Sequence, residues 1–219
     1  MDSNFILTLV LFAIPFIFAV TFHEAAHGYV ARKFGDRTAE MMGRITLNPI
    51  KHIDPIGTLL VPGMMFLMAK MVGAPFFLFG WAKPVPINPS HFRDPVRNMR
   101  WVTAAGPLSN LAMALIWAVV WKLSMLFPGM FAIGMIEMAT FGVLINVLLM
   151  VLNLIPILPL DGGRIVDSFL PWKWSMSFRR IEPYGIWILL LLLVFGGLGK
   201  VLWPLVNSII GLIRMLVGL

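Results

Sequence analysis

The segment at residues 23–27 reads His-Glu-x-x-His and lies at the end of a long apolar run. Because residues four apart on a helix share a face, His23 and His27 can offer two imidazole nitrogens to one Zn²⁺. Glu24, on the adjoining face, can act as the general base of a hydrolysis. Chance is the alternative explanation, but a chain with only 4 His among 219 residues rarely produces this spacing at random. The motif therefore predicts metal-dependent hydrolysis inside a membrane.

A catalytic zinc usually takes three protein ligands, and the absence of Cys leaves His and carboxylates as candidates. Asp161 is the favoured third ligand, because a carboxylate on irregular backbone at membrane depth is costly unless it binds something. Its alternative role is to cap the short helix that follows. Glu137 is a weaker candidate, since it lies near the other end of its helix. His52 and His91 are expected to be interfacial or structural residues.

The composition is that of a membrane protein. Hydrophobic residues make up 59% and charged residues 12% of the chain, against roughly 25% charged residues in ordinary globular proteins. Several segments approach the ~20 apolar residues that a helix needs to cross a bilayer. The sequence therefore predicts an all-α polytopic membrane protein that forms one membrane-embedded domain over residues 1–219, with the lipid bilayer as a partner.

The net charge of +7 could indicate a nucleic-acid-binding protein. The basic residues, however, flank apolar segments and do not form a continuous stripe with aromatic residues. Their placement is better explained by the orientation of the protein in a membrane. We therefore expect no nucleic acid partner.

Several elements must position the motif and Asp161. Residues 4–34 are predicted to form one helix that exceeds the ~30 Å hydrocarbon thickness. Residues 36–55 are polar and rich in turn residues, so we expect small extended or β elements there. Residues 56–79 are apolar but interrupted by Gly and Pro, which favours a re-entrant or hairpin segment over a clean span. Residues 80–98 are expected to form an amphipathic connector at the membrane surface.

The second half of the chain supplies further apolar helices. Predicted helices over residues 101–127 and 133–154 complete a three-helix catalytic core of about residues 4–170. Two shorter apolar runs then predict a C-terminal helical hairpin over about residues 185–218.

The two halves of the metal site must lie at the same membrane depth. If residues 56–79 enter and leave on one side, the following two helices run outward and return, and bring Asp161 to the side of the His pair. If that segment spans the bilayer, Asp161 emerges about 30 Å away, on the opposite face. Only the re-entrant topology can close the site.

The distribution of charge supports the same topology. In the re-entrant topology, all of the 17 basic residues except Lys70, Lys122 and Lys200 lie on the side of the His pair. Arg214 is among the residues expected on that side. Because positive residues are enriched in cytoplasmic loops, we expect the site to face the cytoplasm, in the plasma (inner) membrane of a prokaryote.

Three motifs in the predicted helices together resemble a known family. They are the His-Glu-x-x-His segment at 23–27, Gly-Pro-Leu-Ser-Asn at 106–110, and Asn-Leu-Ile-Pro at 153–156 leading to Leu-Asp-Gly at 160–162. The chain resembles the site-2 proteases, intramembrane zinc metallopeptidases of the M50 class, over about residues 5–170. The segments at 48–55 and 80–86 look like the compact subgroup of that family, and no inserted PDZ or CBS domain is visible.

The resemblance implies one catalytic Zn²⁺ bound by His23, His27 and Asp161, with Glu24 as the catalytic base. It also implies that the substrates are transmembrane proteins or peptides, cleaved in or near their membrane segments close to the cytoplasmic face. The sequence does not define the natural substrate or the oligomeric state.

Two asparagines could take part in the reaction. A side-chain amide of Asn110 or Asn153 could stabilise the oxyanion or position the substrate. Each could equally be a buried hydrogen bond that joins two helices. Residues 44–55 or 80–89 could pair with an unwound substrate as an added strand, or could simply cover the mouth of the site.

Two other functions fit the same residues. One is a metal-dependent hydrolase of another amide or of a lipid. The other is a metal-binding transporter or scaffold without proteolytic activity, in which intramembrane His and Asp relay ions. Glu24 favours hydrolysis, because ion transport needs ligands but no base.

Overall fold

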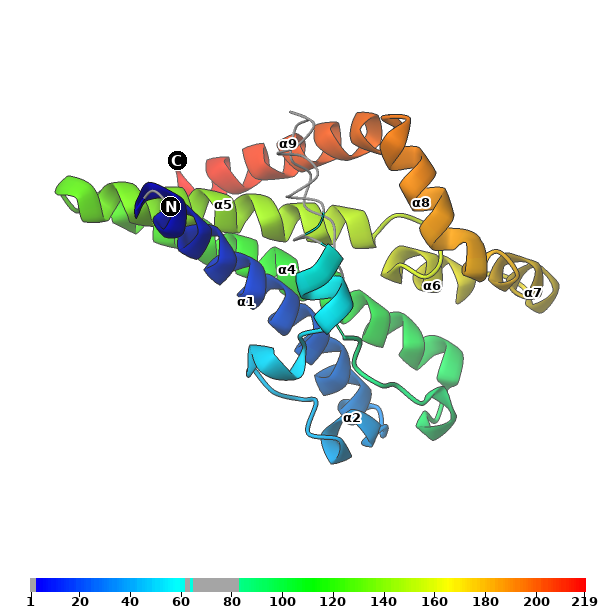
Figure 1. Cartoon of the computed structure of the whole chain (residues 1–219). Helices are drawn as coiled ribbons and strands as arrows, with labels where there is room; N and C mark the ends of the chain where they lie inside the picture. The colour runs from blue at the N-terminus through cyan, green and yellow to red at the C-terminus, as the bar shows by residue number, and fades with distance from the viewer. Residues whose placement is uncertain (1–2, 62–63, 65–82) are drawn as a thin grey trace.

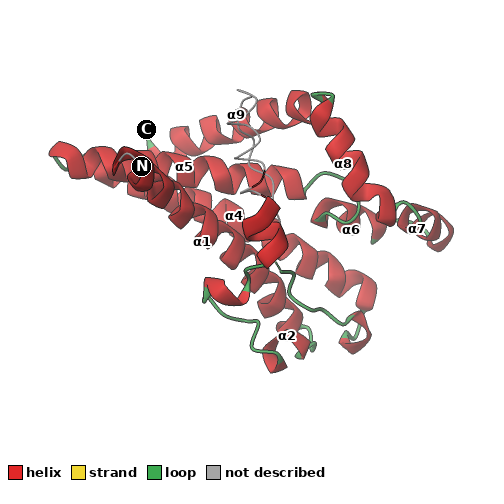
Figure 2. Ribbon diagram, in the orientation of Figure 1, coloured by secondary structure: helices red, strands yellow, loops and turns green. Residues whose placement is uncertain are grey.

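The computed structural model describes residues 3–61, 64 and 83–219 (Figure 1). All regular elements among these residues are helices, which confirms the all-α polytopic membrane fold (Figure 2). The expected re-entrant path of residues 56–79 lies mostly outside the described residues. Of that segment, the structure describes the helical turn η2 (Pro55–Leu60).

Among the residues that the structure describes, four helices carry segments that are long and apolar enough to cross a bilayer. They are α1 (Ser3–Lys33), α4 (Pro95–Ser124), α5 (Gly129–Asn153) and α9 (Gly197–Val217). The first three correspond to the predicted core helices. The protein is therefore an integral membrane protein with a fourth candidate span at its C-terminal end.

Helix α4 begins six residues before its predicted start at residue 101. The Asp94 carboxylate accepts a hydrogen bond from the backbone N–H of Arg97 at 3.0 Å, and Pro95 occupies the first helical position. Both are favourable at a helix N-terminus. The Asp-Pro pair, read from sequence as part of a connector, therefore starts the helix.

Helix α4 runs antiparallel to its neighbours α1 and α5 (Figure 1). On α1 and α4, His27 faces Val102 while Ala19 faces Asn110. The Trp117 side chain of α4 lies directly over Gly142 of α5, where a Cβ atom would approach the indole ring to 2.5 Å. We call the end at which α1 and α5 finish and α4 begins the basic end of the bundle.

Helix α9 runs back along α5, away from the basic end. Leu198 and Leu202 of its first turns line one cavity with Leu149 and Leu152 near the end of α5. Its last turns lie beside the end of α4, where Lys122 donates a hydrogen bond to the Val217 carbonyl. Arg214 lies 5.5 Å from the ring of Trp121. The expectation that Arg214 lies on the side of the metal ligands is therefore wrong.

Arg214 lies at the opposite end because of the geometry of the C-terminal hairpin. Helix α8 (Gly185–Val194) has ten residues and is steeply inclined to α5 and α9 (Figure 1). At ~1.5 Å per residue it is too short to cross a bilayer. It turns at Gly196, whose φ of 70° lies in the left-handed region, into the full-length span α9.

Short helical turns occupy the polar segment after α1. Residues 36–55 contain α2 (Thr38–Met41) and η1 (Pro49–Lys51), so the extended or β structure expected there is wrong for this segment. The side chains of Asn48 and Asp54 accept hydrogen bonds from the following backbone N–H groups and favour helical turns over strands. Residues 83–88 have no regular secondary structure.

The remaining elements lie at the basic end. They are η3 (Pro89–His91), α6 (Asp161–Asp167), α7 (Trp172–Arg179) and η4 (Glu182–Tyr184). Helix α6 packs against α4, which brings its first residue toward the His pair of α1.

Candidate metal centre

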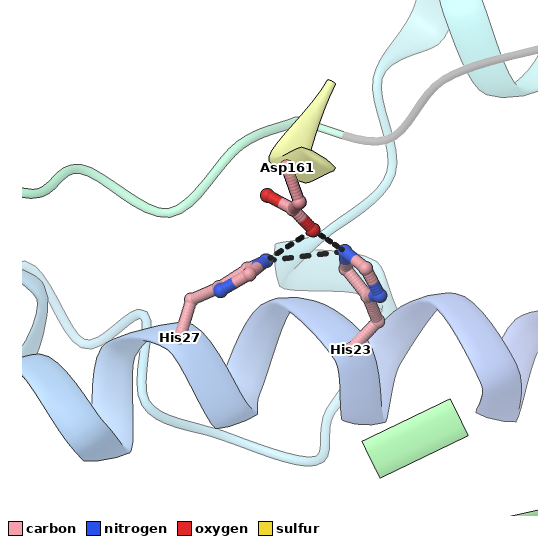
Figure 3. A group of neighbouring side chains, drawn as sticks. All are labelled: His23, His27 and Asp161. Carbon is pink, nitrogen blue, oxygen red and sulfur yellow. Dashed lines mark hydrogen bonds and ion pairs between the residues drawn. The ribbon is translucent and has the colours of Figure 1, made fainter. Parts of the chain in front are cut away.

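Three side chains from α1 and α6 converge at one point in the bundle (Figure 3). The Nε2 atoms of His23 and His27 lie 3.1 Å apart. The Oδ2 atom of Asp161 lies 3.2 Å from the first and 3.3 Å from the second. The structure therefore brings together all three sequence-predicted ligands.

The second nitrogen of each imidazole fixes the orientation of its ring. The Nδ1–H of His23 donates to the Oδ1 atom of Asn110 at 2.7 Å, and the Nδ1–H of His27 donates to the Val102 carbonyl at 2.7 Å. Because both acceptors are oxygens, each Nδ1 carries the proton and each Nε2 presents a lone pair. Such outer partners raise the basicity of His ligands.

The donor set fits Zn²⁺. Two Nε2 lone pairs and a carboxylate oxygen face one another, and Asp161 Oδ2 is buried without a hydrogen-bond donor. Three acceptors this close require a positive charge between them. Two imidazoles and one carboxylate form a set found in catalytic zinc sites, which keep a further position open.

Asp161 is placed by close backbone packing. It is the first residue of α6, and the N-cap residue before it, Leu160, makes no side-chain capping hydrogen bond. A Cβ atom on Gly162 would collide with the Leu154 carbonyl, and one on Gly163 would lie 2.5 Å from the Ile157 carbonyl carbon. Helix α6 therefore rests directly on the irregular chain that leads into it, which only glycine permits at these two positions.

Gly106 lets α4 approach the two imidazoles. A Cβ atom at this position would lie 2.5 Å from His23 Cε1 and 2.5 Å from His27 Nε2. The structure shows that the close approach is made to the ligands themselves.

Glu24 is held from the outside by a backbone amide. The N–H of Val85, in the irregular segment 83–88, donates to Glu24 Oε2 at 2.9 Å. The buried Arg44 guanidinium anchors this segment, donating to the carbonyls of Lys83 at 2.7 Å and Pro84 at 3.3 Å. No motif indicated this support, because a contact to a backbone amide leaves no signature in side-chain types.

A cavity of about 310 Å³ lies beside the site. Its walls include His23, Glu24, His52 and Asn153, and its other walls are mainly apolar side chains of α1, α5, α8 and the start of α9. His52 is almost fully buried, and its Nε2–H donates to the Thr46 carbonyl at 2.9 Å. Its Nδ1 atom has no partner among the described residues.

The two candidate asparagines occupy different places. Asn153 lines the cavity, and its amide donates one hydrogen bond, to the Leu149 carbonyl at 2.9 Å. Asn110 is fully buried behind His23, and its amide donates to the Ala19 carbonyl and to Asn146 Oδ1, both at 3.1 Å. Asn110 therefore fits the helix-joining role better than the oxyanion role.

Asn146 is a site residue that the sequence analysis missed. It is fully buried, and its amide donates to the Gly142 carbonyl at 2.8 Å. An Asn flanked on both sides by apolar residues of a membrane helix was the available signal, because polar side chains at that depth usually bind another helix or a ligand.

Two other candidates lie apart from the metal ligands. Glu137 is exposed in the first half of α5, far along the helix from Asn153. His91 lies beyond the end of α1, where its Nδ1 is 3.0 Å from the fully buried Asp36. Burial alone would raise the pKa of Asp36, but hydrogen bonds from Thr38, from the Asn88 N–H and from His91 lower it below its usual value.

Comparisons with known proteins agree with this geometry. The family model described as "Peptidase family M50" matches residues 123–196, a range that includes Asn153 and Asp161. The chain is 39% identical over 199 residues to "Putative zinc metalloprotease YwhC" of Bacillus subtilis, an alignment that covers 89% of this chain and 85% of the relative.

More distant relatives carry a similar description. The chain is 25% identical to "Putative zinc metalloprotease Rip2" of Mycolicibacterium smegmatis, over 93% of this chain and 74% of the relative. It is 28% identical to the protein of the same name from Mycobacterium tuberculosis, over 78% of this chain and 61% of the relative. No solved structure matches the chain.

Proposed function

Because this chain belongs to peptidase family M50, we propose that it is an intramembrane zinc metalloprotease that cleaves membrane proteins in or near their transmembrane segments. The observation that carries the proposal is the convergence of His23, His27 and Asp161 beside Glu24, at an apolar cavity between membrane-spanning helices. Metal ligands alone would fit a metal-binding scaffold. The Glu24 carboxylate beside them favours hydrolysis, because hydrolysis also needs a general base.

His23, His27 and Asp161 would hold the metal, and Asn110 and the Val102 carbonyl would keep the imidazoles in the required tautomer. When bound, Zn²⁺ supplies Lewis acidity toward a carbonyl oxygen and lowers the pKa of water.

Glu24 is the proposed general base. The Val85 N–H occupies Glu24 Oε2, which leaves Oε1 to take the proton of the attacking water. The same carboxyl group then returns the proton to the leaving amine. A fixed carboxylate loses little entropy when it reaches the transition state.

Asn153 and His52 are the proposed contacts to the substrate. One amide hydrogen of Asn153 has no acceptor among the described residues, and it can donate to the substrate carbonyl or to the developing oxyanion. His52 also lines the cavity, and its buried Nδ1 lone pair has no partner among the described residues, so it accepts a hydrogen bond from a substrate amide once the substrate displaces the side chains that cover it. Both groups match the needs of a peptide that has left its helical conformation.

Transmembrane proteins and the bilayer are the proposed partners. The apolar side chains of α8 and α9 that line the cavity suit a segment arriving from the lipid. Arg32, Lys33 and Arg97 lie at the basic end, so the positive-inside rule supports a cytoplasmic position for the site in a bacterial inner membrane.

The test is cleavage of single-span substrates by the reconstituted protein. Glu24→Gln should lower the rate by about 10²–10⁴-fold, because a base is removed while the ligands remain. Its zinc content should be unchanged. Glu137→Gln, at an exposed position away from the ligands, is the matched control and should cleave normally.

Two results would contradict the proposal. Normal cleavage by Glu24→Gln would remove this residue from the mechanism. Stoichiometric zinc without cleavage of any single-span substrate by the unmodified protein would instead support a metal-binding scaffold.

A further inference from the structure

Two adjoining clefts lie at the start of α4, outside the metal centre. Their volumes are about 510 and about 500 Å³, and they share Asp94, Arg97 and Trp101. The first reaches Arg100 of α4 and Phe169, just after α6. The second extends to the end of α1. We call the two together the α4 cleft.

The α4 cleft is strongly cationic. Its charged lining residues are one carboxylate and four cations, namely Asp94, Lys33, Arg93, Arg97 and Arg100. The side chains of Arg93 and Arg97 make no hydrogen bond or ion pair with any residue that the structure describes. Asp94 is already engaged as the cap of α4, so two guanidinium groups remain available to an anion.

Arg100 is fixed in the wall of the cleft. Its Nε–H donates to Ser168 Oγ at 3.0 Å, and a terminal N–H donates to the Ser168 carbonyl. Its guanidinium carbon lies 3.9 Å from the centre of the Phe169 ring. These contacts join α4 to the end of α6 and give the cleft a rigid side.

Trp101 sets the depth of the cleft in the membrane. It is 57% exposed, and 21 positions along α4 separate it from Lys122. At ~1.5 Å per residue this separation is about 31 Å, close to the ~30 Å hydrocarbon thickness. Trp is typical of the boundary between hydrocarbon and headgroups, so the basic residues above it lie at headgroup level.

An apolar stripe runs along α4 below Trp101. Its members are exposed and recur at helical spacing: Leu108, Ile116, Val119 and Leu123. A lipid in the same leaflet can therefore lay its acyl chains on the stripe while its headgroup enters the cleft.

We propose that the α4 cleft binds the headgroup of an anionic phospholipid. Guanidinium groups bind phosphate oxygens with charge-assisted, often bidentate, hydrogen bonds. The stripe favours a lipid over a free phosphate ion, which would contact the cationic part alone. Because α4 also carries Gly106 and the Val102 carbonyl, a lipid held here would stabilise the helix that supports both imidazoles.

The test is native mass spectrometry of the purified protein with phosphatidylglycerol and, separately, with phosphatidylcholine. Phosphatidylglycerol should bind with at least tenfold higher affinity. The double variant Arg93→Gln/Arg97→Gln should lose about 10- to 30-fold of that affinity, in line with the attraction of basic residues to anionic lipid. Zinc content and thermal stability without added lipid should remain those of the unmodified protein.

The matched control is Lys173→Gln/Arg180→Gln, which removes the same charge from exposed positions outside the cleft. It should change the affinity by less than about twofold. Equal losses in both double variants, or equal binding of the two lipids, would overturn the proposal. Displacement of the lipid by millimolar inorganic phosphate would overturn it in favour of a free-anion site. Arg97→Lys, which keeps the charge, should retain most of the binding.

Discussion

Asn110 and Asn153 show how two similar side chains differ in role because of what they contact. Asn110 is fully buried and accepts the Nδ1–H of His23, whereas Asn153 lines the cavity. Loss of such an outer partner typically weakens metal binding by about 10–100-fold. Loss of a group that contacts the reacting atoms instead lowers kcat.

We therefore expect Asn110→Ala to weaken zinc binding by about 10–100-fold, measured by competition with a chelator. Asn153→Ala should keep its zinc affinity and lose about 10²-fold in kcat, as for a removed oxyanion donor. If the two variants showed the same zinc affinity, the positioning role of Asn110 would be wrong.

Gly106 is the second residue whose role depends on a neighbour. Gly106→Ala places a methyl group 2.5 Å from both imidazoles, so either the ligands or α4 must move. We expect a loss of zinc and a cost of about 1–3 kcal/mol in unfolding free energy, as for overpacked cores. Zinc content and thermal unfolding of the purified variant are the measurements.

Gly134 of α5 offers the control for this substitution. A Cβ atom there meets nothing within 4 Å. Gly134→Ala should therefore keep zinc and should be neutral or slightly stabilising, because Ala favours helix. An equal zinc loss in both variants would indicate a general effect of Gly replacement in these helices.

The metal ligands were predictable from the sequence. The groups that hold the ligands and Glu24 in place by hydrogen bonds were not. His23 and His27 are spaced by one helical turn, so local geometry alone places them together. Whether Asn110 binds His23 or the substrate depends on which face of α4 meets α1, and tertiary packing decides that. The Val85 amide is available at any position, so no residue type marks it.

Among the elements, the irregular segment 83–88 supports the site although it has no regular secondary structure. Arg44 fixes two of its carbonyls, and Val85 then reaches Glu24. The position of Glu24, the proposed general base, therefore depends on a guanidinium in a different segment of the chain. Arg44 is a positioning residue in this arrangement.

We expect Arg44→Gln to lower kcat by about 10-fold while zinc content stays unchanged, because misplacement of a catalytic group is costly even when the group remains. Arg37→Gln is the control, since Arg37 is largely exposed and its one ion pair with a described residue is to Glu40, at 3.6 Å. Full activity in Arg44→Gln would show that Val85 keeps its place without this anchor.

The predicted elements differ from the structure in two places: the start of α4, which is set by its cap, and the C-terminal helices, whose directions hydropathy does not determine. Hydropathy predicted α1, α4 and α5, because each apolar run is long and its ends are marked by turn residues. It did not predict that α8 stops after ten residues and that α9 spans alone, because a short apolar run can equally be half of a hairpin. Arg214 was misplaced for that reason.

For the whole molecule, the ligand set joins the first long helix to the start of α6. A metal that binds only the folded bundle stabilises it, by about 4 kcal/mol at a free concentration near 1,000 times Kd. We expect a chelator to lower the melting temperature of the purified protein, and added zinc to restore it. The melting temperature of Asp161→Ala should not respond to either treatment, and a full response would place the stabilising metal elsewhere.

The ligands also lie far apart along the chain. Asp161 follows His27 by 134 positions, which the ribosome adds in about 7 to 27 s at roughly 5–20 residues per second. During that interval the nascent protein carries the proposed base, Glu24, and two imidazoles but no third ligand. A chain that stops early never obtains one. The order of synthesis thus keeps the proposed peptidase inactive beside other newly inserted membrane proteins until its own bundle is nearly complete.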